Sequence, residues 1–296
     1  MASRARSLLL GAGLAALLLV VFLVTVWVLM AVVEDGALPG GPRVAVVEIE
    51  GIIVDGDQVV RDLREHVDNP AVKAVVVRVN SPGGVVAPTQ EIVSAIQRVR
   101  KAGKPVVASF GAVAASGGYY VGTAADRIYA SPGTLTGSIG VVMQMANVEG
   151  LLKKVGVDYV VVKAGAYKDV GNFARPMTPD ERRILQALLD DVHGQFIAAV
   201  AQGRGLDTDT VRSIADGRIY SGQQALALKL IDTLGGFEDA IEAAGQMAGV
   251  PGKPKVILPR KRFSFFDLLR NEVGLGAPSA LLPGLPSLRT PLYLMY

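Results

Sequence analysis

Short apolar segments rich in β-branched residues alternate with amphipathic segments from residue 43 to residue 163, and this alternation limits the possible folds more than any other feature. Strands are predicted over 43–51, 72–80, 104–110, 126–130, 138–143 and 157–163. Helices are predicted over 55–70 and 87–103, and a further helix begins within "SGGYYVGTAAD" at 116–126. Strands separated by helices form right-handed βαβ crossovers. The sequence therefore predicts an α/β fold with a largely parallel sheet.

The chain becomes mostly helical after residue 175. One helix is predicted to begin with a capping box of Thr178 and Glu181 and with Pro179 at its first position, and another begins similarly at Ser221. The final segment, 259–296, is apolar but rich in proline and glycine, too broken to span a membrane. We interpret it as an extended tail. Its last residues, "PLYLMY", either occupy a substrate groove or a neighbour's surface, or pack on their own domain.

The N-terminal segment 8–33 carries no charged residue. As a helix rising about 1.5 Å per residue it would extend roughly 39 Å, enough to cross a hydrocarbon core of about 30 Å with some tilt. Arginines precede the segment and acidic residues follow it, so the positive-inside rule predicts a cytoplasmic N-terminus and a main domain outside the cytoplasm. The apolar region is longer than in a cleaved signal peptide, so we favour an uncleaved transmembrane helix.

These patterns divide the chain into an N-terminus with membrane anchor at 1–33, a linker at 34–42, a main domain at 43–258 and a tail at 259–296. The net charge of +3 is too small to indicate nucleic-acid binding. The absence of cysteine excludes disulfides and thiolate metal sites, and two histidines disfavour a histidine-rich metal site. We therefore expect no metal, no cofactor and no nucleic-acid partner.

A single hydroxyl, Ser116, stands among small residues in "FGAVAASGGYY". As a nucleophile it would need an adjacent base. The two histidines, His66 and His193, both fall within predicted amphipathic helices, which disfavours a Ser-His-Asp triad. The surrounding A-A-S-G-G also differs from the G-x-S-x-G motif of α/β-hydrolases. If Ser116 is a nucleophile, its base is therefore expected to be another kind of residue.

A lysine can serve as that base if it is neutral. The pKa of a free lysine is about 10.4, so the fold would have to lower it by desolvation or by a neighbouring cation. The stretch "VVKAGAYKDVG" offers Lys163 and Lys168, and the residues alone do not choose between them. A third stretch, "VNSPGGVV" at 79–86, follows a predicted buried strand. Its glycines are either a plain turn or a place where backbone N–H groups stabilise an oxyanion.

The motifs "NSPGG", "AASGGYY", "TLTGSIGV" and "GAYKDVG" occur in this order, and together they resemble the signal peptide peptidase A family. These are membrane-anchored bacterial and archaeal Ser–Lys peptidases of the Clp-protease/crotonase superfamily. The resemblance covers roughly residues 43–250. It implies a Clp-protease/crotonase-like ββα spiral core with a C-terminal helical part, and it makes 43–258 the peptidase domain. Clp-type enzymes use a His–Asp pair, whereas here no histidine follows Ser116 before His193.

The resemblance assigns a role to each matching residue. Ser116 would be the nucleophile, Lys168 rather than Lys163 the general base, and Ser138 the residue that orients the lysine. The backbone N–H groups of Gly83 and Gly117 would form the oxyanion hole, with Gly84 as an alternative to Gly83. The implied activity is a serine endopeptidase without a metal or cofactor.

The family also implies partners: apolar peptides, in particular signal peptides left in the membrane after preprotein processing, the membrane itself, and other copies of the chain in a homo-oligomer. The serine and the lysine that match the family's dyad, Ser116 and Lys168, fall within a single repeat, so the site is completed either by assembly or within one subunit. Two other readings stay open. One is an acyl-CoA enzyme of the crotonase fold, and the other is a catalytically silent oligomeric membrane scaffold.

Overall fold

The computed structural model describes residues 13–27 and 41–259, together with the backbone of 292–294. The chain divides into two compact units, 1–42 and 43–296, and each is considered by itself. In the first unit, residues 13–27 are helical. Among the residues that the structure describes, no helix has both the length and the apolar character needed to cross a membrane. The remaining residues of the anchor predicted at 8–33 lie outside the described residues.

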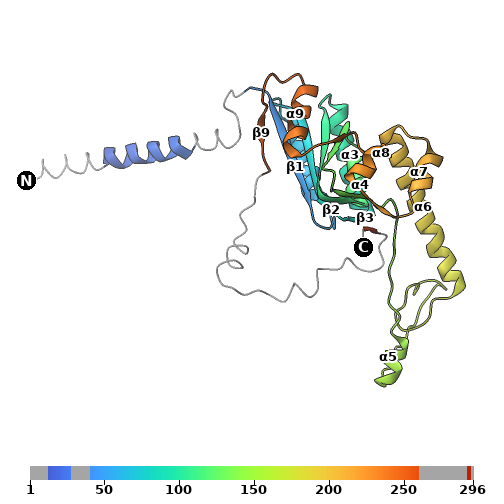
Figure 1. Ribbon diagram of the computed structural model, residues 1–296. Helices are drawn as coiled ribbons and strands as arrows, with labels where there is room; N and C mark the ends of the chain where they lie inside the picture. The colour runs from blue at the N-terminus through green and yellow to red at the C-terminus, as the bar shows by residue number, and fades with distance from the viewer. Residues whose placement is uncertain (1–12, 28–40, 260–291, 295–296) are drawn as a thin grey trace, which may run out of the picture. The chain divides into compact units, whose positions relative to one another are not determined.

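The second unit is built on a mixed sheet in which strand order is β7-β6-β4-β2-β1-β9, with β5 paired to β4 and β8 paired to β5 (Figure 1). All of these pairings are parallel except that of β6 with β7. The prediction of an α/β fold with a largely parallel sheet is therefore confirmed. The strands are β1 Arg43–Glu50, β2 Val72–Ser81, β4 Val106–Ala115, β5 Arg127–Ala130, β6 Leu135–Gly137, β7 Ile219–Ser221, β8 Thr233–Leu234 and β9 Lys255–Ile257.

The predicted helices are also confirmed, as are both capping boxes, Thr178 with Glu181 and Ser221 with Gln224. The helices of this unit are α2 Asp57–Asp68, α3 Val86–Lys101, α4 Gly117–Gly122, α5 Glu149–Lys154, α6 Pro179–Arg204, α7 Thr208–Ile214, α8 Gly222–Ala227 and α9 Phe237–Met247. Two short strands that the sequence did not indicate, β3 Gly83–Val85 and β10 Leu292–Leu294, form a separate antiparallel pair.

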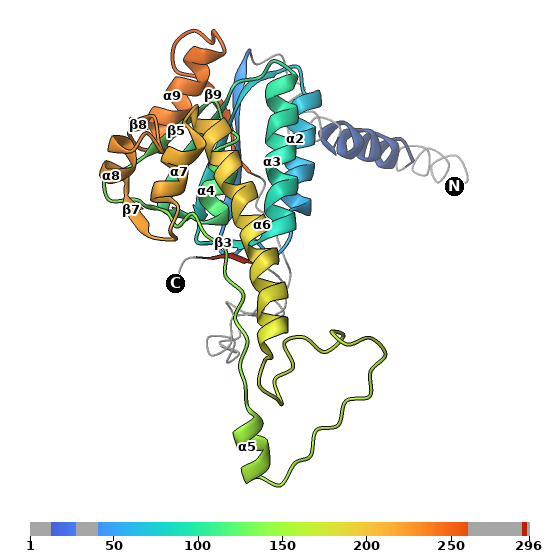
Figure 2. The ribbon, with the colours of Figure 1, turned by 90° about the vertical axis from the view of Figure 1, so that its right-hand side faces the viewer.

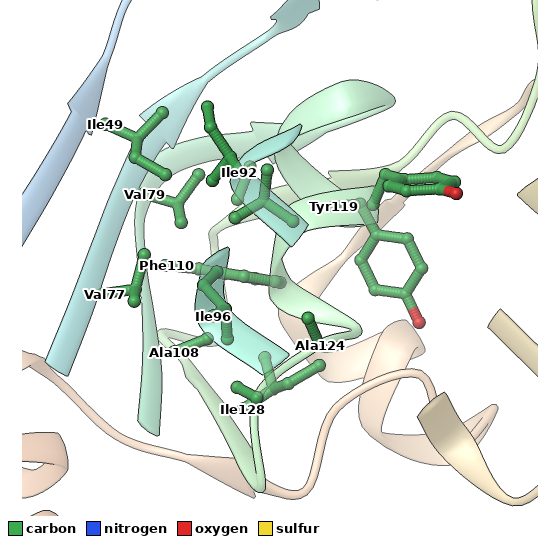
Figure 3. Close-up of a cluster of buried hydrophobic side chains, with 14 of the residues drawn as sticks. Ile49, Val77, Val79, Ile92, Ile96, Ala108, Phe110, Tyr119, Ala124 and Ile128 are labelled. Atoms are coloured by element: carbon green, nitrogen blue, oxygen red, sulfur yellow. The ribbon is translucent and has the colours of Figure 1, made fainter. Parts of the chain in front are cut away.

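Alternation along the central strands sends side chains to two cores. Val47, Val77 and Ala108 are neighbours across β1, β2 and β4, and they belong to the core cluster that also contains residues of α3 and α4. Figure 3 shows this cluster, in which the rings of Phe110 and Tyr119 meet edge to face at 6.2 Å. The intervening residues of the same strands pack with α9. Figure 2 shows α2 and α3 on one side of the strands and α9 on the other.

Two of the predicted strands are wrong. Residues 138–143 contain no strand, because Ser138 adopts a positive φ of 50° and the chain leaves the sheet there. Residues 157–163 form no strand within the described residues, and Val160 and Val162 are 80% and 96% exposed. β-branched residues favour a strand only where a neighbouring strand completes its hydrogen bonds. Residues 141–178, which include α5, are hereafter called the arm, and Figure 2 shows them extending away from the sheet.

The sheet divides along β4. The first part of this strand pairs with β5 through residues 107–109, whereas its end pairs with β6 through residues 113–115. On the opposite side, the β2–β4 register shifts between Val79 and Ser81. The end of β4 therefore pairs with β6 on one side and with β2 in a shifted register on the other. The chain turns directly from this end into α4.

Candidate active site

Ser116 occupies the turn between β4 and α4. Its backbone has φ 53° and ψ −118°, a conformation that side-chain-bearing residues rarely adopt and that costs about 1–3 kcal/mol. The turn is secured on both sides, because Ser116 N–H donates to the Gly137 carbonyl at 2.8 Å and Tyr120 N–H donates to the Ser116 carbonyl at 2.8 Å. A sharp, strained strand-to-helix turn is how α/β-hydrolases present their nucleophile. The conformation is therefore that of a nucleophile elbow, although the sequence motif is absent.

The hydroxyl of Ser116 has no partner. Its Oγ is buried and makes no hydrogen bond with any of the described residues. Leaving a buried hydroxyl unpaired costs about 1–3 kcal/mol, so structures rarely retain one without a reason. Strain and an unsatisfied hydroxyl coincide at this one residue, as expected of a group whose partner belongs to a ligand or to another chain.

The glycines after Ser116 permit a close approach of two backbone segments. A Cβ at Gly118 would lie 2.6 Å from the Ser81 carbonyl oxygen. A Cβ at Gly117 would lie 3.1 Å from Gly84 N and 3.2 Å from Gly83 Cα. The structure therefore brings together Gly83 and Gly84 of β3 and Gly117 at the start of α4, which are the three candidates for the oxyanion hole.

The two alternatives for the first oxyanion donor differ in their hydrogen bonds. Gly83 N–H donates to Ser81 Oγ at 3.1 Å, so this hydrogen is already used. The Gly84 nitrogen is the one that faces Gly117. The assignment of Gly83 stays a prediction. Ser81 is a buried residue that the sequence analysis did not single out, although it stands within the quoted "NSPGG".

Ser138 lies one residue beyond the carbonyl that accepts the Ser116 N–H. Its own N–H donates to the Arg218 carbonyl at 2.8 Å, which holds the positive φ in place. The residue is nearly buried and lines a cavity of about 510 Å³. His193 of α6 lines the same cavity, and its Nε2 is buried without a hydrogen-bond partner among the described residues. This histidine therefore lies closer to the site than its helical position suggested.

The two candidate lysines of the arm differ in their hydrogen bonds and ion pairs. Lys163 donates to the Ala166 carbonyl at 2.8 Å and forms an ion pair with Asp169. Lys168 is exposed, and its Nζ makes no hydrogen bond or ion pair within the described part of the chain. Of the two lysines, only Lys168 is without a partner for its Nζ within the described residues, and its role as base stays a prediction. It is not hydrogen-bonded to Ser116, whose Oγ has no partner among the described residues.

A network of charged groups fixes the lysine-bearing part of the arm to the first turn of α6. Arg175 Nε donates to Asp169 Oδ2 at 3.1 Å, and Arg175 Nη1 donates to Glu181 Oε2 at 2.9 Å. Glu181 also accepts the Thr178 N–H at 2.8 Å as part of the capping box. The hydrogen bond from Lys163 lowers the pKa of Asp169 to about 2, and the hydrogen bond from Arg175 lowers the pKa of Glu181 to about 2.

We expect this network to weaken in acid. Because the folded-state pKa values lie below the ordinary values of about 3.9 for Asp and 4.3 for Glu, the stabilisation is complete above those values. It is lost as the pH falls towards 2. Carboxyl titration by NMR should give Glu181 a pKa near 2, and Arg175→Met should return it towards 4.3. Arg183→Met, which removes an exposed pair with Asp180, should leave it unchanged. An unaltered Glu181 titration in Arg175→Met would contradict the network.

The close approach at Gly118 predicts a large effect of one methyl group. Gly118→Ala would place Cβ against the backbone oxygen of Ser81, which cannot rotate away, so we expect a loss of about 1–3 kcal/mol in unfolding free energy. Gly194→Ala is the matched control, because this helical glycine has open space around it and alanine is the better helix former. Denaturant unfolding of both variants tests the prediction. Equal stability of the two would refute the tight contact.

Several known proteases have sequences similar to that of this chain. The sequence profile of peptidase family S49 matches residues 98–251. A Synechocystis protein named "Putative protease slr0021" is 46% identical over 209 residues, which cover 70% of this chain and 75% of that protein. "Putative signal peptide peptidase SppA" of Enterococcus faecium is 34% identical over 71% of this chain and 64% of its own length. "Protease 4" of Salmonella typhi is 37% identical over 70% of this chain but only 35% of its own length.

The family match and the identity to the Synechocystis protein show that the chain belongs to peptidase family S49. Within that family it is of the signal peptide peptidase A type that the motifs resemble. It is therefore a protease. The alignment spans about a third of the Salmonella protein and just under two thirds of the Enterococcus protein, so their full activities do not transfer directly.

Proposed function

We propose that the chain is a membrane-anchored serine endopeptidase with Ser116 as nucleophile and Lys168 as general base. The observation that carries the proposal is the coincidence at Ser116 of a strained turn and a buried hydroxyl without a partner. Backbone amides of Gly117 and of the Gly83–Gly84 turn lie beside it, where an oxyanion would form. The finer fold assignment, a Clp-protease/crotonase-like spiral behind a transmembrane helix, belongs to the same proposal.

The reaction follows from these roles. Neutral Lys168 accepts the proton of the Ser116 hydroxyl while Oγ attacks the peptide carbonyl carbon, and the carbonyl π electrons move to oxygen. The N–H groups of Gly117 and Gly83, or Gly84, stabilise that oxyanion. As the intermediate collapses, the C–N bond breaks, and the protonated lysine gives its proton to the leaving amine. Water then hydrolyses the acyl-enzyme by the same steps, and Ser138 orients the lysine throughout.

The lysine is proposed to come from a neighbouring copy of the chain in a homo-oligomer. The arm that carries Lys168 extends away from the sheet, and its apolar stretch 159–162 is exposed (Figure 2). Exposed β-branched backbone without a strand partner is a surface on which another chain can add. The cavity beside Ser138 offers room for the neighbour's lysine segment.

The proposed substrates are apolar peptides, in particular signal peptides left in the membrane. Two features support this class: the apolar, uncharged stretch 8–33, which would hold the protease at a bilayer, and the printed name of the Enterococcus relative. In this proposal the N-terminus is cytoplasmic and the peptidase domain lies outside the cytoplasm.

Two measurements on the detergent-solubilised full chain test the proposed function. A biotinylated fluorophosphonate should label Ser116, as located by mass spectrometry of the digested protein. An apolar signal-peptide fragment should be cleaved internally, and faster than a length-matched peptide in which alternate apolar residues are replaced by Glu and Lys. Labelling with equal cleavage of both peptides would overturn the substrate class. If Ser116 is not labelled and neither peptide is cleaved, the assignment of Ser116 as a peptidase nucleophile is overturned.

A further inference from the structure

The cavity that Ser138 lines contains a buried imidazole nitrogen without a partner. His193 lies on α6, and its Nε2 makes no hydrogen bond with any of the described residues. Within that part of the chain, two other buried side-chain atoms share this condition, Arg43 Nε and the nucleophilic Oγ of Ser116. A buried polar atom normally has a partner, so Nε2 is expected to pair with a group on a ligand or on another chain.

The other ionisable side chains that line this cavity already have partners. On α6, Asp190 Oδ1 accepts a hydrogen bond from Gln186 Nε2 at 2.7 Å. On the segment before β7, Asp216 Oδ1 accepts a hydrogen bond from Arg218 Nε at 2.8 Å. The remaining wall, residues 140–143, contains no ionisable side chain. The imidazole Nε2 is therefore left as an acceptor for an incoming donor.

The proposed mechanism brings such a donor to the cavity, because Lys168 of a neighbouring copy enters beside Ser138. The Nζ of Lys168 has no partner of its own within the described part of the chain. A neutral amine that accepts the Ser116 proton uses its lone pair and keeps two N–H donors. Acceptors must hold both donors if the lone pair is to point at the nucleophile. Ser138 supplies one acceptor, and His193 lines the same cavity.

We propose that His193 is a positioning residue whose Nε2 accepts a hydrogen bond from Lys168 of the neighbouring copy. The inference rests on the proposed function, in which that lysine enters the cavity beside Ser138. The contact requires the neutral tautomer with its proton on Nδ1 and its lone pair on Nε2. Protonation of Nε2 in acid removes this acceptor and places a second cation beside the lysine, so the contact is then lost.

Kinetic measurements on the full chain separate the ring of His193 from its acceptor. His193→Phe keeps a ring but has no acceptor, so kcat for an apolar peptide should fall about tenfold, as for one lost hydrogen bond. His193→Gln keeps a side-chain acceptor and should restore most of kcat, while KM changes little in both variants. His66→Phe is the matched control at the chain's other histidine, in α2, and should leave kcat unchanged. An unchanged kcat in His193→Phe, or equal losses in the Phe and Gln variants, would overturn the proposal.

The pH dependence gives a readout that a merely structural role would not change. With a lysine as base, kcat/KM falls about tenfold per pH unit on the acid side. Between about pH 8 and 5, where histidine side chains titrate, the wild type should lose about a further tenfold as Nε2 is protonated. His66→Phe should keep this additional fall, and His193→Gln should lack it. The same additional fall in His193→Gln would overturn the role of Nε2.

Nitrogen-15 NMR tests the contact without requiring catalysis. In the Ser116→Ala chain with His66→Phe, His193 is the one histidine left to label. Accepting a hydrogen bond shifts the Nε2 resonance, so Lys168→Ala should move this signal. Lys154→Ala is the control, since Lys154 is also an exposed lysine of the arm, and it should not move the signal. A signal that ignores Lys168, in a chain whose wild type cleaves peptide, would reject the contact and keep the protease. A signal that responds to Lys168, without any cleavage by the wild type, would reject the proposed function and keep the contact.

Discussion

Replacing Ser116 by alanine is expected to lower peptide cleavage by at least about 10³-fold while leaving the fold intact. The hydroxyl is the only group on this side chain that can attack a carbonyl, so its removal ends covalent catalysis. Because Oγ has no hydrogen-bond partner among the described residues, the variant loses no intramolecular bond. We expect its Tm to stay within about 2 °C of the wild type, which corresponds to less than ~1 kcal/mol.

Ser109→Ala is the matched control for this variant. Ser109 is equally buried, but its Oγ accepts a hydrogen bond from Arg78 Nη1 at 2.9 Å. Its removal should cost about 1 kcal/mol of stability because the charged donor loses one of its two acceptors and keeps the Phe110 carbonyl, yet cleavage should continue. Activity is measured by mass spectrometry and stability by calorimetry. If the Ser116→Ala variant still cleaves the peptide, Ser116 is not the nucleophile.

Mixing two inactive variants should restore activity. In oligomers that contain Ser116→Ala and Lys168→Ala copies at random, about one site in four draws its serine and its lysine from intact neighbours, so about a quarter of wild-type activity is expected. If each chain used its own lysine, every site would lack one group and the mixture would stay inactive. The exposed position of Lys168 on the arm is the physical reason for expecting recovery.

A second mixture gives the control. Wild-type copies mixed equally with the double variant, Ser116→Ala with Lys168→Ala, should also retain about a quarter of the activity if sites are shared, but about half if they are not. The mixtures are made by co-expression with two affinity tags, and tandem purification isolates the mixed oligomers. No recovery in the first mixture together with half activity in the second would place the lysine within one chain.

Much of the sheet could be predicted because its central strands are buried on both faces. Continuous β-branched runs such as 72–80 are typical of parallel strands and rarely of anything else. The same reasoning failed at 157–163, where the composition is equally strand-like but the described part of the chain offers no partner strand. A pattern of residues reports that a segment suits a sheet, whereas pairing depends on what lies next to it in space.

In the candidate site, too, some features could be predicted from the local sequence and others could not. The spacing of small residues pointed to Ser116 and to the glycine turn at 83–84, because these features need only local sequence. The positive φ of Ser116, the use of Gly83 N–H by Ser81 and the pairing of β10 with β3 depend on contacts between segments far apart in the chain. The Nε2 of His193, which has no hydrogen-bond partner among the described residues, likewise becomes visible only when α6 is placed beside the Ser138 segment.

Because the arm is attached to the first turn of α6, a tilt of this helix displaces the arm. Phe196 and its neighbours bury one end of α6 in the core, while Glu181 at the other end holds Arg175 and thereby the lysine segment. The two points are about 22 Å apart along the helix, so a tilt of only 5° at the buried end moves the arm by about 2 Å. Substitutions around Phe196 would therefore shift the lysine segment without touching it, and in the proposed homo-oligomer that shift would reach the proposed active site of a neighbouring copy.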